Sequence, residues 1–247
     1  MPSNSFCAYS KKQQDAFSFV GNQASLAGIN NSGVGFFSEQ RFLIKNYSSH
    51  QMVFVTKGRN INFGVQFNYT GMKNFNDFSL GLAAGKKLSD KIDIGAQINF
   101  NTEKAMLYNR KINLNFESGV LIHLTPVLNV GIHLYNPAGL IIASKKEGRV
   151  PGVYKFGVGY DASDDFHISA EMLKEEGMPV SVQVGFQYQY RKKFFTRFCY
   201  INNLQRICFV AGITSGKIRM AVHCSSHPQL GITPGISVLL NTVTKKK

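Results

Sequence analysis

Apolar and polar residues alternate strictly along most of the chain, from about Gly33 to its end. In one run the apolar positions are Ile61, Phe63, Val65, Phe67 and Tyr69. A period of two is that of a β-strand, because successive side chains of a strand point to opposite faces. The pattern predicts an all-β protein whose strands have two chemically different faces.

Alternating runs of this kind number about fourteen, and turn-forming residues separate them. They lie at 33–41, 49–56, 60–71, 76–88, 92–102, 110–124, 128–136, 153–161, 166–174, 179–191, 194–202, 206–214, 217–226 and 234–243. No stretch reaches the roughly 18 consecutive apolar residues of a membrane-spanning helix. An even number of antiparallel strands is typical of bacterial outer-membrane barrels, so we expect a single transmembrane β-barrel of about fourteen strands.

The connections between these runs alternate in length. Short ones lie at 57–59, 89–91, 125–127, 191–193 and 215–216, and the longest lie at 136–152 and 226–233. Outer-membrane barrels have short turns on the periplasmic side and longer loops outside. The alternation therefore favours a barrel over an open sheet, which has no reason to sort its connections by length.

Hairpin register gives an independent test, because correct pairing must place apolar residues opposite one another on one face. Turns near 90, 126, 163 and 215 each allow such a pairing. The expected partners are Leu82 with Ile98, Val120 with Ile132, Val158 with Ile168, and Ile213 with Ile218.

The polar face distinguishes a membrane barrel from a soluble sandwich. It carries Asn, Gln, Ser and many glycines, and charged residues make up 17% of the chain against roughly 25% in ordinary soluble domains. Glycines confined to one face, such as Gly64, Gly95 and Gly157, permit strong curvature and the close approach of other groups. We expect the apolar face to meet lipid and the polar face to line a narrow, partly filled lumen.

The charge balance is strongly basic, with 28 Lys and Arg against 14 Asp and Glu. Such an excess raises nucleic-acid binding as one interpretation. The basic residues are nevertheless spread over the predicted turns, as at Lys57, Lys87 and Lys192, and form no single block. We expect them to face lipid headgroups, so the predicted partner is outer-membrane lipid and not nucleic acid.

Residues 1–28 are expected to form an N-terminal segment, either a hatch or a periplasmic tail, before a barrel of residues 29–247. The first sixteen residues contain charges and no apolar stretch, so they do not read as a secretory signal. A bacterial outer-membrane barrel needs such a signal for export. A soluble β-protein with a basic surface therefore stays open as an alternative to the membrane barrel.

Catalysis has no support in the sequence. Neither a nucleophile-elbow motif nor a glycine-rich phosphate loop is present, and the acid pair Asp164 and Asp165 falls in a predicted turn. His123 and His133 are expected to point into the lumen diagonally, which does not suit a shared metal. The spacing of the four cysteines is not that of a zinc site. We predict no enzyme activity, no metal and no cofactor.

Cys199 and Cys208 are a separate case. A turn centred near Asn203 and Leu204 places these two cysteines directly opposite one another on the polar face. A disulfide is one interpretation, and two small lumenal residues that simply fit is the other. We favour the second, because directly opposed strand positions often have poor disulfide geometry.

The segment 21–28, before the first predicted strand, resembles the entry segment of a known family, the FadL-like (long-chain fatty-acid transporter) barrels and their PorV/PorQ relatives. The later segments 134–139, 154–161 and 227–235 resemble PorV/PorQ-like outer-membrane proteins. The first departs from the family pattern at Gln23, where Pro is common. The resemblance covers most of residues 16–243 and implies a barrel of fourteen strands.

PorV-like members serve type IX secretion by handling secreted cargo, so the resemblance implies an accessory or scaffolding barrel of the bacterial envelope. Its partner would be an envelope or secretion protein that binds the two long loops. The candidate contact residues are Tyr135, Asn136, Pro137, His227 and Pro228.

FadL-like members admit hydrophobic molecules through a lumen blocked by an N-terminal hatch, which implies the alternative of a passive transporter for hydrophobic or anionic small molecules. By alternation Arg197, Arg206 and Arg219 project into the lumen from adjacent strands and form a candidate basic patch. The other interpretation is that they neutralise acids inside a closed barrel. The acids considered are Asp93, Glu117 and Glu171.

Overall fold

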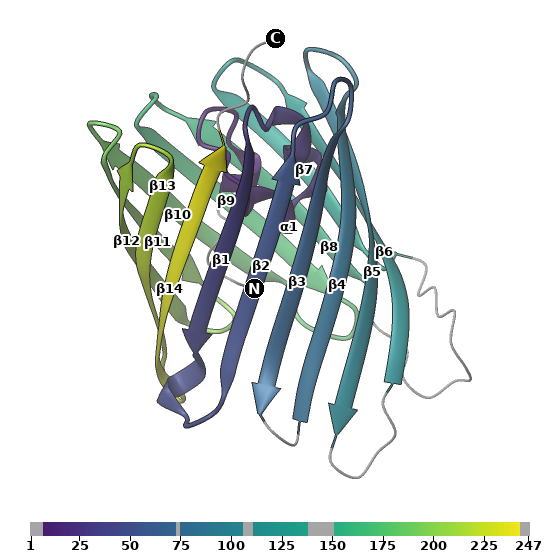
Figure 1. Ribbon diagram of the computed structural model, residues 1–247, viewed down its shortest axis with the longest axis vertical. Coiled ribbons are helices and arrows are strands. Elements are labelled where there is room, and N and C mark those ends of the chain that lie inside the picture. The colour runs from purple at the N-terminus through teal and green to yellow at the C-terminus, as the bar shows by residue number, and fades with distance from the viewer. Residues whose placement is uncertain (1–6, 73–74, 106–110, 138–150, 243–247) are drawn as a thin grey trace.

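The computed structural model describes residues 7–72, 75–105, 111–137 and 151–242. Fourteen antiparallel strands form a closed barrel (Figure 1). They are β1 (Ser32–Gln40), β2 (Ser48–Thr56), β3 (Asn62–Met72), β4 (Phe75–Lys87), β5 (Ile92–Ala105), β6 (Lys111–His123), β7 (Leu128–Tyr135), β8 (Val153–Asp161), β9 (Phe166–Glu175), β10 (Ser181–Tyr190), β11 (Phe194–Ile201), β12 (Arg206–Ser215), β13 (Ile218–His227) and β14 (Gly231–Thr242).

Short helices flank the first strand: α1 (Ser18–Gly21) and η2 (Gln23–Gly28) precede β1, and η3 (Arg41–Leu43) follows it. Across the described ranges, every helix is too short or too polar to cross a membrane.

The sheet closes because each strand pairs with its neighbours along the chain and β1 also pairs with β14. Closure leaves no row of unpaired backbone N–H and C=O groups, which a lipid environment could not satisfy. The predicted transmembrane barrel of fourteen antiparallel strands is thereby confirmed.

The outer face of the barrel is apolar. Phe63 is 50% exposed and Val222 is 61% exposed, whereas their sequence neighbours Asn62 and Ala221 are buried. A continuous apolar exterior of this kind suits hydrocarbon and is not found on soluble monomers. The period-two pattern therefore separates a lipid-facing surface from a lumenal one.

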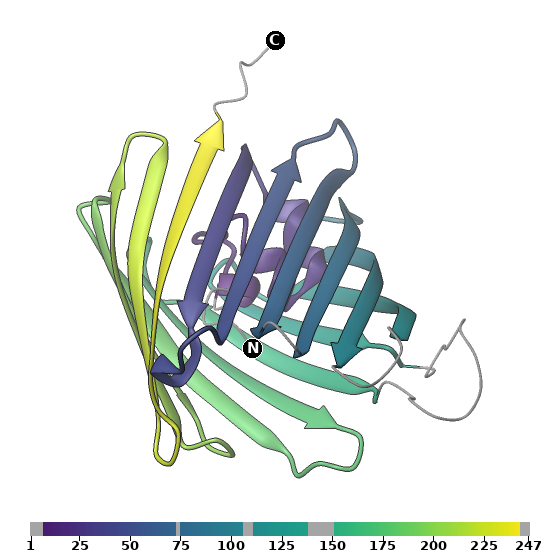
Figure 2. The ribbon, with the colours of Figure 1, turned by 60° about the horizontal axis from the view of Figure 1, so that its bottom comes forward.

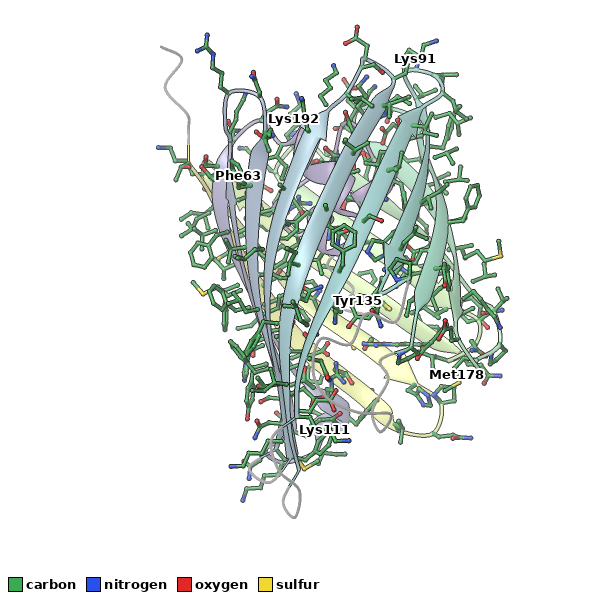
Figure 3. The ribbon with its side chains drawn as sticks, turned by 90° about the vertical axis from the view of Figure 1, so that its right-hand side faces the viewer. Phe63, Lys91, Lys111, Tyr135, Met178 and Lys192 are labelled. Atoms are coloured by element: carbon green, nitrogen blue, oxygen red, sulfur yellow. The ribbon has the colours of Figure 1, made fainter. Side chains whose placement is uncertain are left out.

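The connections are sorted by length between the two ends of the barrel. The turns that precede β3, β5, β7, β9, β11 and β13 gather at the end where β14 finishes, at the top of Figure 1, and we call it the short-turn end. β7 ends and β8 begins at the opposite, long-loop end. Lys91 and Lys192 mark the short-turn end in Figure 3, and Lys111 and Met178 mark the long-loop end.

Two of the four expected hairpin registers are confirmed. Leu82 pairs with Ile98, and Val120 pairs with Ile132. Both hairpins turn at the residues that the sequence indicated.

The other two registers were wrong by two residues. Ile213 pairs with Met220, because Ser215 is the last paired residue and the turn is made by Gly216 and Lys217. Gly216 has φ of 58°, the left-handed conformation that a tight hairpin turn requires. Val158 likewise pairs with Ala170 and not with Ile168. A shift of two residues preserves the face, so the apolar side chains still point outward.

The lumen is occupied at the short-turn end by residues 7–29, which we call the plug (purple in Figures 1 and 2). Plug and wall share an apolar core formed by Ala16, Phe17, Phe19, Leu26, Ile29, Phe37, Val53, Val55, Ala83 and Leu239. The interior of the barrel is thus partly filled by the chain's own N-terminal segment.

Candidate functional site

The plug packs closely on the glycines of the lumenal face. A Cβ atom on Gly95 would lie 2.3 Å from the backbone carbon of Gln23, and one on Gly85 would lie 2.5 Å from Cβ of Leu26. Distances this short exclude any larger residue at either position without displacement of the plug. The glycines of the polar face therefore make room for the plug backbone. This agrees with the expectation from the sequence that these glycines permit the close approach of other groups inside the lumen.

Tyr9 occupies a second glycine surface, on β7 and β8. A Cβ atom on Gly157 would lie 2.2 Å from Cζ of the Tyr9 ring. The Tyr9 hydroxyl donates a hydrogen bond of 2.6 Å to Oε2 of Glu171. Burial, with the nearby Glu171 carboxylate, raises the pKa of Tyr9 well above its ordinary value, so the phenol stays protonated as the donor.

Asp161 anchors the plug at the end of β8. Its carboxylate is fully buried and accepts hydrogen bonds from the Ser10 hydroxyl at 2.6 Å and from the Lys11 backbone N–H at 2.9 Å. Nδ1 of His167 lies 2.8 Å from the same carboxylate. A buried carboxylate needs such partners, so withdrawal of the plug would leave it partly unsatisfied.

Asp15 of the plug joins two of the three predicted lumenal arginines. Its Oδ2 atom lies 3.0 Å from Nη2 of Arg197 and 3.3 Å from Nη1 of Arg219. The Arg219 guanidinium also lies over the Phe195 ring, 3.7 Å from its centroid. The two arginines share one buried carboxylate, so they are not free to receive an anion from the lumen.

Arg206 lies apart from this pair. It donates a hydrogen bond of 2.6 Å to the Ser225 hydroxyl and approaches Glu39 at 4.0 Å. The basic patch expected from Arg197, Arg206 and Arg219 is thus divided. Arg197 and Arg219 pair with Asp15, and Arg206 approaches Glu39. Any solute-binding role of the three stays a prediction.

The acids expected to neutralise these arginines have other partners. Glu117 accepts hydrogen bonds from Gln23 of the plug at 2.5 Å and from Asn99 at 2.5 Å, and it lies 2.9 Å from His133. Asp93 pairs with His123 at 2.9 Å.

The two histidines accordingly serve different carboxylates. Within the described ranges, no group of three or more His, Cys, Asp and Glu side chains has an arrangement that could hold a metal ion.

Lys12 and Asp164 form an ion pair of 2.6 Å at the rim of the short-turn end. The hydrogen bond from Lys12 lowers the pKa of Asp164, and the same contact raises the pKa of Lys12. Both side chains are solvated, so the pair adds little to the seating of the plug.

The long-loop end of the lumen is hollow beside β9, β10 and β11. This cavity, which we call the vestibule, has a volume of about 340 Å³. Its lining is mostly apolar and consists of Val153, Glu171, Leu173, Glu175, Met178, Pro179, Ser181, Gln183, Ile201, Asn203 and Leu204. Glu171 both lines the vestibule and accepts the Tyr9 hydrogen bond, so the cavity and the plug meet at this carboxylate.

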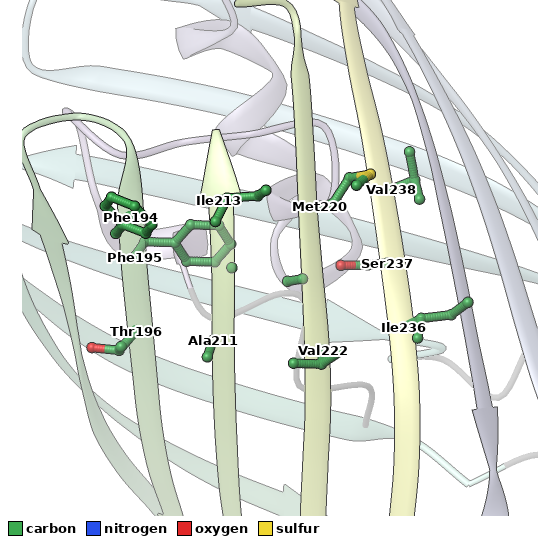
Figure 4. A pocket seen from close by; sticks show the side chains of 12 residues that line it. Phe194, Phe195, Thr196, Ala211, Ile213, Met220, Val222, Ile236, Ser237 and Val238 are labelled. Atoms are coloured by element: carbon green, nitrogen blue, oxygen red, sulfur yellow. The ribbon is translucent and has the colours of Figure 1, made fainter. Parts of the chain in front are cut away.

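A second cavity of about 550 Å³ opens on the wall formed by β11 to β14 (Figure 4). Its outward-facing lining includes Ile213, Met220 and Val222, and no charged side chain contributes to it. The groove is almost entirely apolar, with the hydroxyl residues Thr196 and Ser237 in its lining, and its outward-facing side meets the same surroundings as the rest of the exterior.

The predicted loop contacts lie at the long-loop end. The Tyr135 hydroxyl accepts a hydrogen bond of 2.8 Å from Asn115, and Asn136 is buried. The carbonyl of Pro137 accepts a hydrogen bond of 3.4 Å from the Tyr154 hydroxyl. The 138–150 portion of the expected partner-binding loop lies outside the described residues.

His227 and Pro228 belong to the other candidate loop. The His227 ring packs edge-on against Phe42 with centroids 6.2 Å apart, and Pro228 is exposed. Binding of a protein partner through either loop stays a prediction.

Sequence reasoning missed the plug anchors Tyr9, Ser10 and Asp15. The glycine-rich face indicated that something would fill the lumen, but no local pattern identified which residues would do so. The available signal was Asp15, an acid in a segment without strand periodicity, together with Arg197 and Arg219, which the alternation places on the lumenal face.

Comparison with known proteins gives the fold a context. No protein-family model matches the chain, and no curated protein matches its sequence. The structure is similar to CymD, a monoaromatic hydrocarbon channel, with a TM-score of 0.66 and 12% identity over 94% of each chain.

Two further solved structures agree. The toluene transporter TbuX of Ralstonia pickettii gives a TM-score of 0.66 with 11% identity over 92% of each chain. A FadL homologue of Pseudomonas aeruginosa gives 0.67 with 10% identity, over 96% of this chain and 98% of that one. These likenesses show the fold of FadL-like barrels, whereas the PorV/PorQ part of the resemblance stays a prediction.

Proposed function

We propose that the chain is a passive transporter of small, uncharged, apolar solutes in a bacterial outer membrane, with the plug controlling passage. The observation that carries the proposal is the division of the lumen. Its short-turn end is filled by the plug, its long-loop end is an apolar vestibule, and the two meet at the contact between Tyr9 and Glu171. A solute would enter the vestibule and pass only after rearrangement of the plug.

The structural relatives support transport over the accessory role that the sequence resemblance had favoured. They are named as hydrocarbon channels and transporters, and they share the barrel of this chain over nearly its whole length. This also agrees with the prediction that the chain is not an enzyme. Participation in type IX secretion would require partner binding at the long loops.

The charges around the lumen favour a neutral solute over an anion. The vestibule carries the carboxylates Glu171 and Glu175 and has no cationic side chain among its lining residues. Arg197 and Arg219, the cations that an anionic solute would need, are paired with Asp15. A volume of about 340 Å³ lies at the lower end of the range of small-molecule pockets, which suits a compact solute.

Solute binding can be tested by fluorescence, because the chain contains no tryptophan. The Leu204→Trp variant places one indole in the vestibule, and Leu88→Trp places a matched indole at the exposed short-turn end. We expect a small neutral aromatic hydrocarbon to change the emission of the first variant saturably and that of the second only by partitioning into detergent. An aromatic carboxylate of the same size should bind at least tenfold more weakly.

Transport itself is tested by uptake of the same hydrocarbon into lipid vesicles that contain the protein. Saturable uptake above that of protein-free vesicles is expected. Uptake equal to that of protein-free vesicles, or preference for the carboxylate in both assays, would overturn the proposal.

A further inference from the structure

Three cysteines from separate parts of the chain meet at the boundary between the plug and the wall. Cys7 of the plug, Cys199 of β11 and Cys208 of β12 pack into one cluster and are 0%, 5% and 4% exposed. All three are free thiols in the structure. Cys199 and Cys208 are direct partners in the strand register, as the sequence predicted.

We propose that Cys7, Cys199 and Cys208 form a thiol–disulfide exchange site that ties the plug covalently to the barrel wall. The inference goes beyond the proposed transport function and does not depend on it. Its consequence is that the first residues of the plug cannot leave the lumen while the bond between plug and wall persists.

The simplest competing explanation is that small apolar side chains fill space at this point, as free cysteines often do. The chain has only 4 cysteines in 247 residues, and it uses Ala221 and Ser225 at other buried lumenal positions. A need for small side chains does not by itself explain why three cysteines meet at one contact between the plug and the wall, because alanine or serine would also fit. Cys224 provides a contrast, since it is exposed on the outer face, opposite Phe209.

The geometry suits bond formation. Opposed residues of an antiparallel pair have Cα atoms about 4.5–5.5 Å apart, which lies within the range found for disulfides. Cys7 is held against this pair by its own hydrogen bond, in which the thiol donates to Oε1 of Gln187 at 3.2 Å. Gln187 is fixed in turn by hydrogen bonds with Gln13 and Arg197.

The chemistry balances in two steps. First, the thiols of Cys199 and Cys208 lose two protons and two electrons to an external disulfide, which is reduced to two thiols. Second, the Cys7 thiolate attacks one sulfur of the new bond, so that a bond from Cys7 forms, the bond between Cys199 and Cys208 breaks, and the released thiolate takes up the proton. The second step needs no further oxidant.

Burial of the plug slows the attack by Cys7 in the second step, and it also keeps external thiols away from the bond once it has formed. Burial raises the pKa of the Cys7 thiol to about 11, although the nearby Arg197 opposes the shift. Little thiolate is then present near neutral pH, and thiol–disulfide exchange requires the thiolate. The cross-link would therefore form as the plug inserts and would exchange only slowly afterwards.

Peptide mapping tests the proposal directly, because trypsin cleaves after Lys11, Arg197, Arg206 and Lys217 and so places each cysteine of the cluster on its own peptide. Folded protein in detergent is equilibrated with oxidised and reduced glutathione, alkylated, denatured and digested. We expect a disulfide between peptide 1–11 and either peptide 198–206 or peptide 207–217. A bond found only between the last two peptides, or only through Cys224, would overturn the proposal.

Hydrogen exchange of residues 8–15 gives a second readout. In oxidised protein, dithiothreitol should raise the exchange rate of this segment about tenfold, and the Cys7→Ser variant should show no response. The Cys224→Ser variant, matched in chemistry but placed on the outer face, should behave as the unmodified chain. An equal response to dithiothreitol with and without Cys7 would contradict the tether.

Discussion

The two halves of the plug are held in the lumen by different forces. Residues 7–15 contact the wall through hydrogen bonds, ion pairs and two small buried clusters that contain Cys7, Ala8 and Tyr9. Residues 16–29 contribute Phe17, Phe19 and Leu26 to a larger buried apolar core. The wall partners of the first half are Asp161, Asp164, Glu171, Gln187, Arg197 and Arg219.

This difference indicates which half can leave its place. Water can replace most hydrogen bonds of the first half, so their net contribution to stability is modest. No such replacement exists for the apolar contacts of the second half, because exposure of their surface to water costs free energy. We therefore expect residues 7–15 to open locally while residues 16–29 stay seated, a contrast that amide hydrogen exchange resolves segment by segment.

The Phe19→Ala variant attacks the apolar half. Phe19 is fully buried, and its removal leaves a cavity that the closely packed wall cannot fill. We expect a loss of about 3–5 kcal/mol in the free energy of unfolding, measured by denaturant titration in detergent. Phe63→Ala is the matched control, because Phe63 faces lipid; an equal loss in both variants would show that the core contact has no special weight.

The Asp15→Asn variant attacks the polar half. It leaves the buried guanidinium groups of Arg197 and Arg219 without a counter-charge, at an expected cost of about 1.5–3 kcal/mol. Exchange should accelerate in residues 7–15 and stay unchanged in residues 16–29. A second change, Arg219→Gln, should restore part of the protection, and acceleration of both halves together would contradict the division.

The Tyr9→Phe variant sharpens the comparison at the vestibule. It removes the hydrogen bond to Glu171 but retains the ring against Gly157. Because water from the vestibule can solvate Glu171, we expect a loss of only about 0.5–1.5 kcal/mol in local opening, seen as faster exchange near residue 9. Tyr200→Phe, on the outer face of β11, should have no effect there.

Acid should remove the weakest contact of the polar half. The hydrogen bond from Lys12 holds the pKa of Asp164 below its unfolded value of about 3.9, so its stabilising contribution is present above that pH and is lost as the pH falls through the folded pKa. Lys12→Gln should slightly accelerate exchange of residues 11–13 at pH 7 and low salt. The difference from the unmodified chain should shrink as the pH falls below about 3.9, and it should disappear in high salt because the pair is exposed; its persistence at full size under both conditions would contradict the assignment.

Local pattern alone determined the barrel. Strand number, the lipid-facing positions and the sorting of turns all follow from the two-residue period and from connection lengths, because both are properties of neighbouring residues. Register was less secure where a turn had two solutions, as at Gly216, since a shift of two residues keeps the same face outward.

Only the tertiary structure decided what fills the lumen and which charges meet there. Asp15 reaches Arg197 and Arg219, Ser10 reaches Asp161, and Cys7 reaches Cys199, contacts that join residues more than 150 positions apart. The sequence pattern gave the direction of each lumenal side chain but not its depth or its partner. Those depend on how the barrel closes and where the plug settles within it, and no local periodicity records either.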